Sequence, residues 1–352
     1  MTLLKNTYFG SENEIEIAAG IPFPSTDAEA PEVLLASCPA HKKTPLHEKP
    51  ELAAAAGVGS VFLKDETVRM GLGSFKALGA AYVIAHQASE TGAEDLSTSL
   101  KGQTFVTASA GNHGLSVAAG AKVFGAKAVI FLAETVPAAF GDRLRELGAE
   151  VHVTGKDYDE SLVAALKYAE DNSAQVLSDT SWDGYHEFPH RLMEGYLVSA
   201  KEAVGQMKEV PTHIFLQAGV GGLAGAMAAY FRKAWGSEPV ITVVEPDRAT
   251  ALQSSIKAGK SVYAEGPVSN MGRLDCKEPS LIALRGLARD ANYFLTVSDE
   301  LGQETTDRLS DAGIGSTPSG VGGLTGLYAG ENAALGLDET SRVLCIISEG
   351  AE

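Results

Sequence analysis

The chain has 352 residues, 45% hydrophobic and 21% charged, which is enough for more than one globular domain. Its formal net charge of -17 argues against nucleic acid or an anionic membrane as the main partner, because both are bound by clustered Lys and Arg. We expect no membrane span, no signal peptide and a reducing cytoplasm, since the chain lacks an apolar run of about 18 residues and has only the widely spaced cysteines Cys38, Cys276 and Cys345.

The first half of the chain alternates strand-like and helix-like segments. The first 45 residues mix acids with prolines and are predicted to be irregular. A short strand at 60–66 precedes a glycine-punctuated loop and a helix from about Phe75 to Glu90. Apolar, β-prone runs then alternate with amphipathic helices, with strands at 104–109, 126–133, 150–155 and 174–179. This order predicts parallel βαβ units.

The alternation resumes after Trp182 and continues to the end of the chain. The segment 258–280 is predicted to be irregular. Strands are predicted at 212–219, 240–247 and 342–350, and helices at 190–207, 221–235, 281–290, 300–313 and 325–336. The fold class is therefore α/β, with two domains that each contain a mostly parallel sheet covered by helices.

Six turns follow these strands and are the natural places to look for a site. Ligands of parallel sheets bind beyond the carboxyl ends of the strands. We therefore expect these turns to share one crevice or to line two facing ones: LGSFK (72–76), SAGNHG (109–114), SDTSWDGY (178–185), QAGVGG (217–222), VEPD (244–247) and SEG (348–350).

The glycines of QAGVGG suit an anion. Without Cβ atoms the loop can turn its backbone N–H groups onto a phosphate, and the following helix adds its dipole. The spacing is neither G-x-G-x-x-G nor a P-loop, which disfavours a nucleotide. A tight turn without a ligand explains the same residues about equally well.

Lys76 and Asp179 are candidates for proton and amine chemistry. A lysine in a partly dry pocket has a lowered pKa and can attack an aldehyde, although a lysine at a helix start is more often solvated. Asp179 directly follows a predicted strand and could act as a general base or bind a ligand amine. Capping of a helix by Asp179 is an equally good explanation.

Asn112, His113 and Ser348 have simpler explanations when each is taken alone. The SAGNHG loop could hold a carboxylate on its N–H groups, but Asn112 could equally cap the helix with His113 packed beneath it. Ser348 ends a buried strand, where its hydroxyl could face a neutral heterocycle nitrogen or bind the backbone. The order of all these features along the chain is a more specific signal for a functional site than any one of them.

From about residue 42 onward the chain resembles the fold-type II enzymes of pyridoxal phosphate, which include serine/threonine dehydratases and tryptophan synthase β chains. Within this group it is most similar to diaminopropionate ammonia-lyase, on the basis of SDTSWDGY and of MEGY (193–196). The other segments that carry the resemblance are KTPL (43–46), VFLKDE (61–66), GSFKALGAAY (73–82), AGNHG (110–114), HIFLQAGVGG (213–222), VEPD (244–247) and VLCIISEG (343–350).

The resemblance implies a role for each matching residue. Lys76 forms the Schiff base with pyridoxal 5'-phosphate, and Asp179 lies near the substrate amine or α-proton. The implied cofactor-binding residues are Lys76, Phe75, Asn112, Gly219, Val220, Gly221, Gly222 and Ser348. The implied substrate-binding residues are Ser109, Ala110, Gly111 and His113. No metal site is expected.

The resemblance also implies a domain division and an assembly. A large cofactor-binding domain is expected from residues 1–80 and 192–352, and a small substrate-side domain from residues 81–191. Homodimers are usual for this fold type, so we expect a cytoplasmic homodimer that acts on a small amino acid.

The implied reaction is an α,β-elimination that converts 2,3-diaminopropionate to pyruvate and ammonia. Ala110 stands where the ammonia-lyase usually has an aspartate that is linked to the D-isomer, so the L-isomer is expected to be preferred. A dehydratase of a β-hydroxy amino acid such as serine, threonine, hydroxyaspartate or a phenylserine is the alternative. A pyridoxal phosphate-binding protein without catalysis is a further alternative, against which Lys76 argues.

Overall fold

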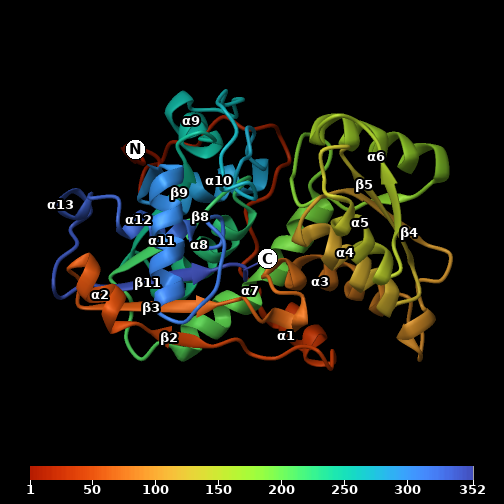
Figure 1. Cartoon of the computed structure of the whole chain (residues 1–352), viewed down its shortest axis with the longest axis horizontal. Helices are drawn as coiled ribbons and strands as arrows, with labels where there is room; N and C mark the ends of the chain where they lie inside the picture. The colour runs from red at the N-terminus through yellow and green to blue at the C-terminus, as the bar shows by residue number, and fades with distance from the viewer. Residues whose placement is uncertain (352) are drawn as a thin grey trace.

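A computed structural model describes residues 1–351 as two lobes, each built on one sheet (Figure 1). The large lobe contains a seven-stranded sheet and the small lobe a four-stranded sheet. The prediction of an α/β fold with two mostly parallel sheets is confirmed. Within the described residues, no helix is both long and apolar enough to cross a membrane.

The large sheet has five parallel strands at its centre and one antiparallel strand at each edge. All five residues of the central strand β8 are buried, as expected for a strand covered on both faces by helices. The strand order across the sheet is β1 (Leu3–Lys5), β10 (Tyr293–Val297), β9 (Val240–Pro246), β8 (His213–Gln217), β11 (Arg342–Ile347), β3 (Ser60–Asp65) and β2 (Leu46–Glu48).

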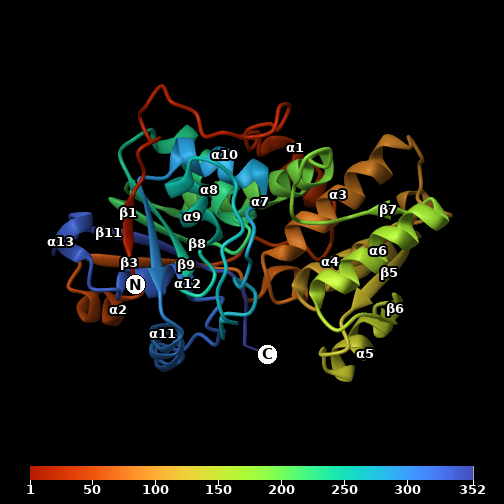
Figure 2. The same cartoon turned by 90° about the horizontal axis from the view of Figure 1, so that it is seen from above.

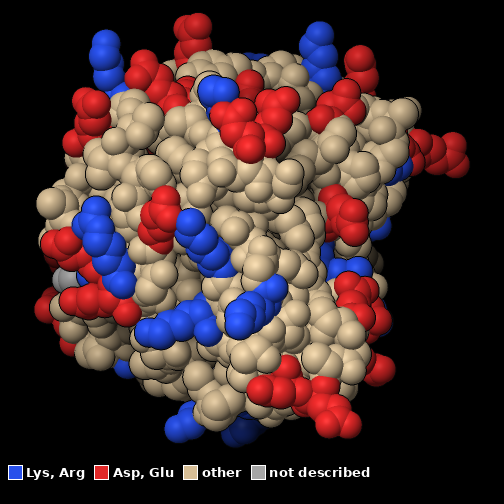
Figure 3. Space-filling model, turned by 90° about the vertical axis from the view of Figure 1, so that its right-hand side faces the viewer, with Lys and Arg blue, Asp and Glu red and all other residues tan. Residues whose placement is uncertain are grey.

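The small sheet is entirely parallel and has its own small core. Its strand order is β6 (Glu150–Val153), β5 (Lys127–Leu132), β4 (Thr104–Ala108) and β7 (Gln175–Val176). Its helices are α4 (Asn112–Val123), α5 (Ala138–Glu146) and α6 (Tyr158–Asn172). The face of this lobe seen in Figure 3 carries acidic and basic side chains intermixed, with several basic ones near its centre.

Helices α3 (Lys76–Glu90) and α7 (Glu187–Gln206) lie between the two sheets (Figures 1 and 2). They cross closely because a glycine stands on each helix at the contact. A Cβ on Gly195 would lie only 3.0 Å from the carbonyl carbon of Leu78, and a Cβ on Gly79 would lie 2.7 Å from Cε1 of Tyr196. The crossing therefore fixes the start of α3, where Lys76 lies, against α7.

The other helices belong to the large lobe or its edges. They are α1 (Glu29–Ala36), α2 (Pro50–Ala56), α8 (Gly222–Trp235), α9 (Ala251–Ala258), α10 (Leu281–Asp290), α11 (Asp299–Asp311), α12 (Gly322–Leu327) and α13 (Asn332–Leu335). Two short 3-10 helices occupy Arg69–Gly71 and Leu96–Thr98. A hydrophobic cluster that includes residues of α3, α7 and α8 continues from one lobe to the other.

A buried group of four charges anchors the chain just before the Lys76 loop. Arg69 donates from Nε to Glu66 at 2.7 Å and from Nη2 to Glu202 at 2.8 Å, and Lys64 Nζ lies 2.6 Å from the same Glu202 oxygen. All four side chains are at least nine-tenths buried. Two cations and two anions balance, so α7 and the end of β3 are held together without net buried charge.

The sequence-based predictions fail mainly for short elements. The first 45 residues were expected to be irregular but contain β1 and α1. The helix predicted at 325–336 is two helices, separated by Gly330 at φ +77°. The strand predicted at 174–179 pairs only at Gln175–Val176. Two- and three-residue strands depend on a neighbouring strand, and the local pattern does not record that neighbour.

Candidate active site

The loop that leads to Lys76 is held by backbone contacts to the end of β11. The Phe75 N–H donates to the Ser348 carbonyl at 3.0 Å, and the Gly350 N–H donates to the Gly73 carbonyl at 3.0 Å. Ser348 is 5% exposed. The structure thus brings together the two ends of the predicted cofactor site, Phe75 and Lys76 on one side and Ser348 on the other.

Lys76 forms an ion pair with Asp179, which follows β7 in the small lobe. Both side chains are partly buried, at 23% and 21% exposure. Burial lowers the pKa of Lys76, but the Asp179 carboxylate outweighs it and holds the pKa above its ordinary value. Burial likewise raises the pKa of Asp179, and Lys76 brings it well below the usual range. The expectation of a lowered lysine pKa is therefore wrong for this pairing.

The glycine loop connects β8 to α8 and comprises Gly219, Val220, Gly221 and Gly222. Gly221 caps α8 at φ +96°, a conformation that favours glycine. A Cβ on Gly219 would lie 2.9 Å from the Cys276 sulfur, so a larger residue would not fit there. The 14-residue helix α8 directs its first N–H groups at this loop, which suits an anion.

The loop 109–113 forms the start of α4. The Ser109 hydroxyl accepts hydrogen bonds from the N–H groups of Gly111 at 3.3 Å and Gly114 at 3.1 Å. Ala110 is exposed at the tip of the loop. Gly111 caps the helix with extended backbone and offers no side-chain oxygen. The first turn of α4 can therefore present N–H groups to a carboxylate.

Asn112 joins the small lobe to the end of β11. Its Nδ2 donates to Oε2 of Glu349 at 2.5 Å. The Glu349 carboxylate also accepts from Thr317 Oγ1 at 2.5 Å and pairs with Arg273 Nε at 2.8 Å. Because one Nδ2 hydrogen is bound to Glu349, the second can face into the site.

His113 lies on the inner side of α4. Its Nε2 is 2.8 Å from the carbonyl oxygen of Leu177, and the ring is buried. Burial lowers its pKa, which favours the neutral imidazole. The side chain thus packs beneath the helix, and only the backbone of His113 belongs to the loop.

The segment VEPD at the end of β9 contacts a neighbouring helix. Glu245, near the end of β9, accepts hydrogen bonds from the N–H groups of Leu252 at 2.7 Å and Gln253 at 2.8 Å, and so caps α9. Burial raises the pKa of Glu245 to about 8. The expectation of a shared crevice is thus supported by direct contacts for the other turns, whereas VEPD supports a neighbouring helix.

Tyr196, Cys276 and Glu349 are among the side chains at this site that the sequence did not single out as site residues. Tyr196 contacts Phe75, Cys276 lies against Gly219, and Glu349 binds Asn112. Tyr196 belongs to the MEGY segment, but a tyrosine in an apolar helix is usually a core residue. The partners of Cys276 and Glu349 come from distant segments, so no local signal marks them.

These features fit pyridoxal phosphate. The site provides an amine at Lys76, a glycine loop at 219–222 that leads into the N-terminus of α8, and a buried Tyr196 hydroxyl without a hydrogen-bond partner of good geometry among residues 1–351. An aldehyde that carries a phosphate would use all three. Within the same residues, no group of three or more His, Cys, Asp or Glu side chains is placed to hold a metal ion.

Comparison with known proteins agrees with this fit. The family model described as "Pyridoxal-phosphate dependent enzyme" matches residues 38–349. Diaminopropionate ammonia-lyase of Escherichia coli K12 is 34% identical over 311 residues, which cover 84% of this chain and 76% of that protein. Human L-serine dehydratase/L-threonine deaminase is 29% identical over 274 residues, or 78% of each chain.

A solved structure matches over nearly the whole chain. It is the crystal structure of diaminopropionate ammonia lyase from Escherichia coli in complex with an aminoacrylate-PLP azomethine reaction intermediate. Its TM-score is 0.88 at 31% identity, and the match covers 99% of this chain and 93% of that chain. The chain therefore belongs to the pyridoxal-phosphate dependent enzymes and, within them, to the family of diaminopropionate ammonia-lyase.

Proposed function

We propose that this enzyme converts 2,3-diaminopropionate to pyruvate and ammonia by α,β-elimination, with a preference for the L-isomer. The observation that carries the proposal is the Lys76–Asp179 pair beside the glycine loop, in a chain of this family. The pair provides an amine and a fixed carboxylate at one place, which is what a proton transfer at a substrate carbon needs.

The proposal assigns the cofactor to residues from both lobes. Lys76 would hold it through the amine, Phe75 would flank the ring, and Ser348 would face the ring nitrogen. The loop 219–222 would hold the phosphate, and Asn112 would face the 3-oxygen. When bound, pyridoxal phosphate withdraws electrons from the substrate carbon that loses its proton.

The protein's own groups would bind the substrate and move its protons. The loop 109–113, which leads into α4 at Asn112, would hold the α-carboxylate on the N–H groups that are not already bound to the Ser109 hydroxyl. Lys76 would take the α-proton as the base. Because Lys76 keeps Asp179 ionised, Asp179 is a poor acid, and the Lys76 ammonium would protonate the leaving amine. Asp179 would hold that ammonium in place.

Ala110 supports the preference for the L-isomer. Its methyl group can neither take nor give a proton, and it is exposed at the tip of the α4 loop. The candidate bases are then Lys76 and Asp179, which form one ion pair, so we expect protons to be removed from only one face of the substrate carbon. Replacing Ala110 with Asp should raise turnover of the D-isomer relative to the L-isomer.

The direct test is to add L-2,3-diaminopropionate to the purified holoenzyme and follow pyruvate, with the D-isomer and L-serine in parallel. We expect rapid pyruvate formation from the L-isomer and little from the D-isomer. Equal rates for both isomers would refute the stereochemical part. Turnover of L-serine alone would favour a β-hydroxy amino acid dehydratase, the activity for which the human relative of this chain is named.

The variant Lys76→Ala tests whether the chain is an enzyme or a cofactor-binding protein without catalysis. We expect loss of both pyruvate formation and the absorbance band of bound pyridoxal phosphate. Asp179→Asn is the companion variant, because it keeps the shape of the side chain but removes the charge next to Lys76. Undiminished turnover in Lys76→Ala would overturn the proposal.

We also propose that the enzyme works in the cytoplasm as a homodimer. Its three cysteines are unpaired, which suits a reducing compartment. We propose the dimer because enzymes of this fold type are usually homodimers. Light scattering of the purified chain would measure its mass in solution, and a monomer at micromolar concentration would contradict the assembly.

A further inference from the structure

Tyr196 lies at the junction of α3, α7 and the glycine loop. It is 1% exposed, and its ring contacts the Phe75 ring edge-on at 4.8 Å between centroids. A Cβ built on Gly79 would lie 2.7 Å from one ε carbon of the ring, and a Cβ built on Gly222 would lie 3.8 Å from the other. The hydroxyl stands between these two carbons, so it points between the first turns of α3 and the start of α8.

The Tyr196 hydroxyl is buried, lies near the Lys76 amine, and has no hydrogen-bond partner of good geometry among residues 1–351. A buried hydroxyl without a partner destabilises the folded protein unless a bound group supplies the partner. Burial raises the pKa of Tyr196 above its ordinary value. Lys76 has a smaller lowering effect on this pKa, and Asp179 has a smaller raising effect. The hydroxyl therefore keeps its proton and can donate it in a hydrogen bond.

The surroundings select an anionic acceptor. The start of the 14-residue helix α8 directs N–H groups into the same space, and its loop lacks side chains at Gly219 and Gly222. The Lys76 amine lies close to the hydroxyl and adds positive charge. A neutral acceptor would make weaker hydrogen bonds with these donors, and a cation would be repelled by them, whereas a phosphate oxygen would gain from each of them.

We propose that the Tyr196 hydroxyl donates a hydrogen bond to the phosphate of bound pyridoxal phosphate, which makes Tyr196 a further cofactor-binding residue. The inference rests on the proposed cofactor site at 219–222. It predicts that removal of the hydroxyl weakens binding of the cofactor's phosphate and leaves binding of its aldehyde end unchanged.

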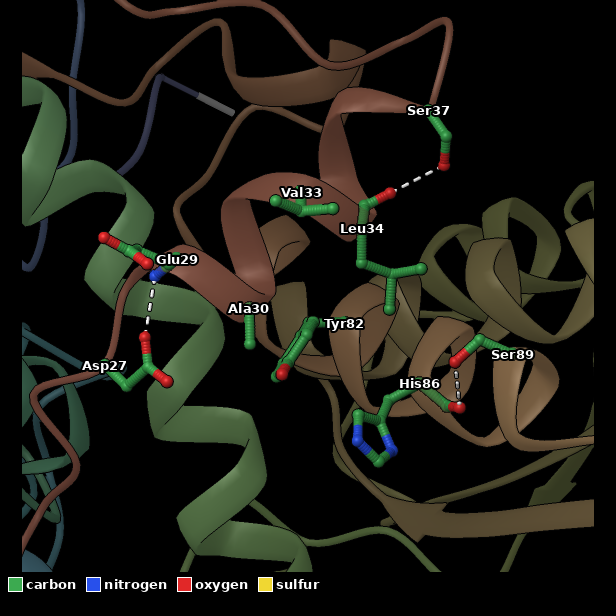
Figure 4. Close-up of a pocket in the computed structure, with 9 residues that line it drawn as sticks. All are labelled: Asp27, Glu29, Ala30, Val33, Leu34, Ser37, Tyr82, His86 and Ser89. Carbon is green, nitrogen blue, oxygen red and sulfur yellow. Dashed lines mark hydrogen bonds between the residues drawn. The ribbon is translucent and has the colours of Figure 1, made fainter.

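The test compares the cofactor with its phosphate-free analogue, pyridoxal. The apoenzymes of the wild type and of Tyr196→Phe are titrated with each compound, and the dissociation constants are measured from absorbance. Tyr82→Phe is the matched control, because Tyr82 is also fully buried on α3 and its hydroxyl also has no partner within residues 1–351. Tyr82 lines a different hollow, of about 510 Å³, between α1 and α3 (Figure 4).

We expect Tyr196→Phe to bind pyridoxal phosphate about 10- to 100-fold more weakly, as for loss of a hydrogen bond to a charged group. Its affinity for pyridoxal should stay within about twofold of the wild type, which is less than the loss of one such bond. Tyr82→Phe should bind both compounds like the wild type. An equal loss for both compounds would overturn the inference, because the hydroxyl would then act on Lys76. No loss for either compound would overturn it too.

Thermal unfolding of the apoenzymes gives a second readout. Tyr196→Phe removes a buried hydroxyl without a partner, so its apoenzyme should melt at a higher temperature than the wild type. Inorganic phosphate, used as the probe, should raise the melting temperature of the wild type more than that of Tyr196→Phe. A lower melting temperature of the variant, with equal protection by phosphate, would mean a packing role only. Failure of the wild type to bind pyridoxal phosphate would instead refute the proposed function.

Discussion

The substitution Gly195→Ala tests how closely α3 and α7 must approach. A Cβ at Gly195 would lie 3.0 Å from both the Leu78 carbonyl carbon and Tyr82 Cβ, and closer still to the Leu78 carbonyl oxygen. Ordinary contacts of this kind begin near 3.4 Å. The obstructing atoms at Leu78 belong to the backbone and cannot rotate away, so the two helices must separate by several tenths of an ångström.

The change in the free energy of unfolding of Gly195→Ala combines two opposing effects. Overpacking of a core costs about 1–3 kcal/mol, and we place this site at the upper end because backbone is displaced. Alanine in place of glycine in a helix returns about 0.5–1 kcal/mol. We therefore expect Gly195→Ala to lower the free energy of unfolding by about 2 kcal/mol, and to weaken pyridoxal phosphate binding because Tyr196 moves with α7.

Gly205 on the same helix provides the control. No atom lies within 4 Å of a Cβ built there, so Gly205→Ala should be neutral or stabilise by up to about 1 kcal/mol. Both variants are unfolded in urea and followed by circular dichroism, with the wild type alongside. If the two variants have the same free energy of unfolding, the close crossing at Gly195 does not constrain the protein and the reasoning is wrong.

Three more predictions concern buried charges and the glycine loop. Glu202→Gln should lower the free energy of unfolding by about 3–5 kcal/mol, because it leaves buried cations without their partner. Glu209→Gln, in an exposed ion pair, should lower it by less than about 1 kcal/mol. Equal losses of unfolding free energy in the two variants, measured in urea, would contradict this prediction. The folded pKa of Glu245 is about 8, against an ordinary 4.5, so the folded state binds the proton more tightly and this residue's contribution to stability falls as the pH rises from about 5 to 8. The melting temperature of Glu245→Gln relative to wild type should therefore increase over that range, and a constant difference would argue against the raised pKa. Gly219→Ala should weaken pyridoxal phosphate binding about tenfold or more in a fluorescence titration, because its Cβ would lie 2.9 Å from the Cys276 sulfur; unchanged affinity would mean that the loop can shift.

The sequence predicts the longer elements of the fold well. Strands such as β5 and β11 each contain a run of five apolar residues, and helices such as α6 have a clear amphipathic period, so their local pattern is enough. The edge strands β1 and β2 are three residues long and exist because a longer strand pairs with them. Their sequences carry too little information for a prediction.

The candidate site was predicted in part for the same reason. Asp179 and the glycine loop lie just after strands, and Lys76 begins the helix that follows β3, which is where chain order alone places functional residues. The raised pKa of Lys76 depends on the approach of Asp179 from the other lobe, which periodicity does not report. The unpartnered hydroxyl of Tyr196 depends likewise on where three distant segments meet.

The position of β11 has a consequence for how the protein folds. This strand lies between β3 and β8 and pairs Arg342 with Ser60, almost at the other end of the chain. The centre of the large sheet therefore cannot form until nearly the entire sequence is available, and such a high contact order makes folding slow. The small lobe pairs only local strands, between Thr104 and Val176, and so should fold first. Until β11 inserts, β3 and β8 expose unpaired edges, and a growing chain would depend on chaperones to keep them from aggregating.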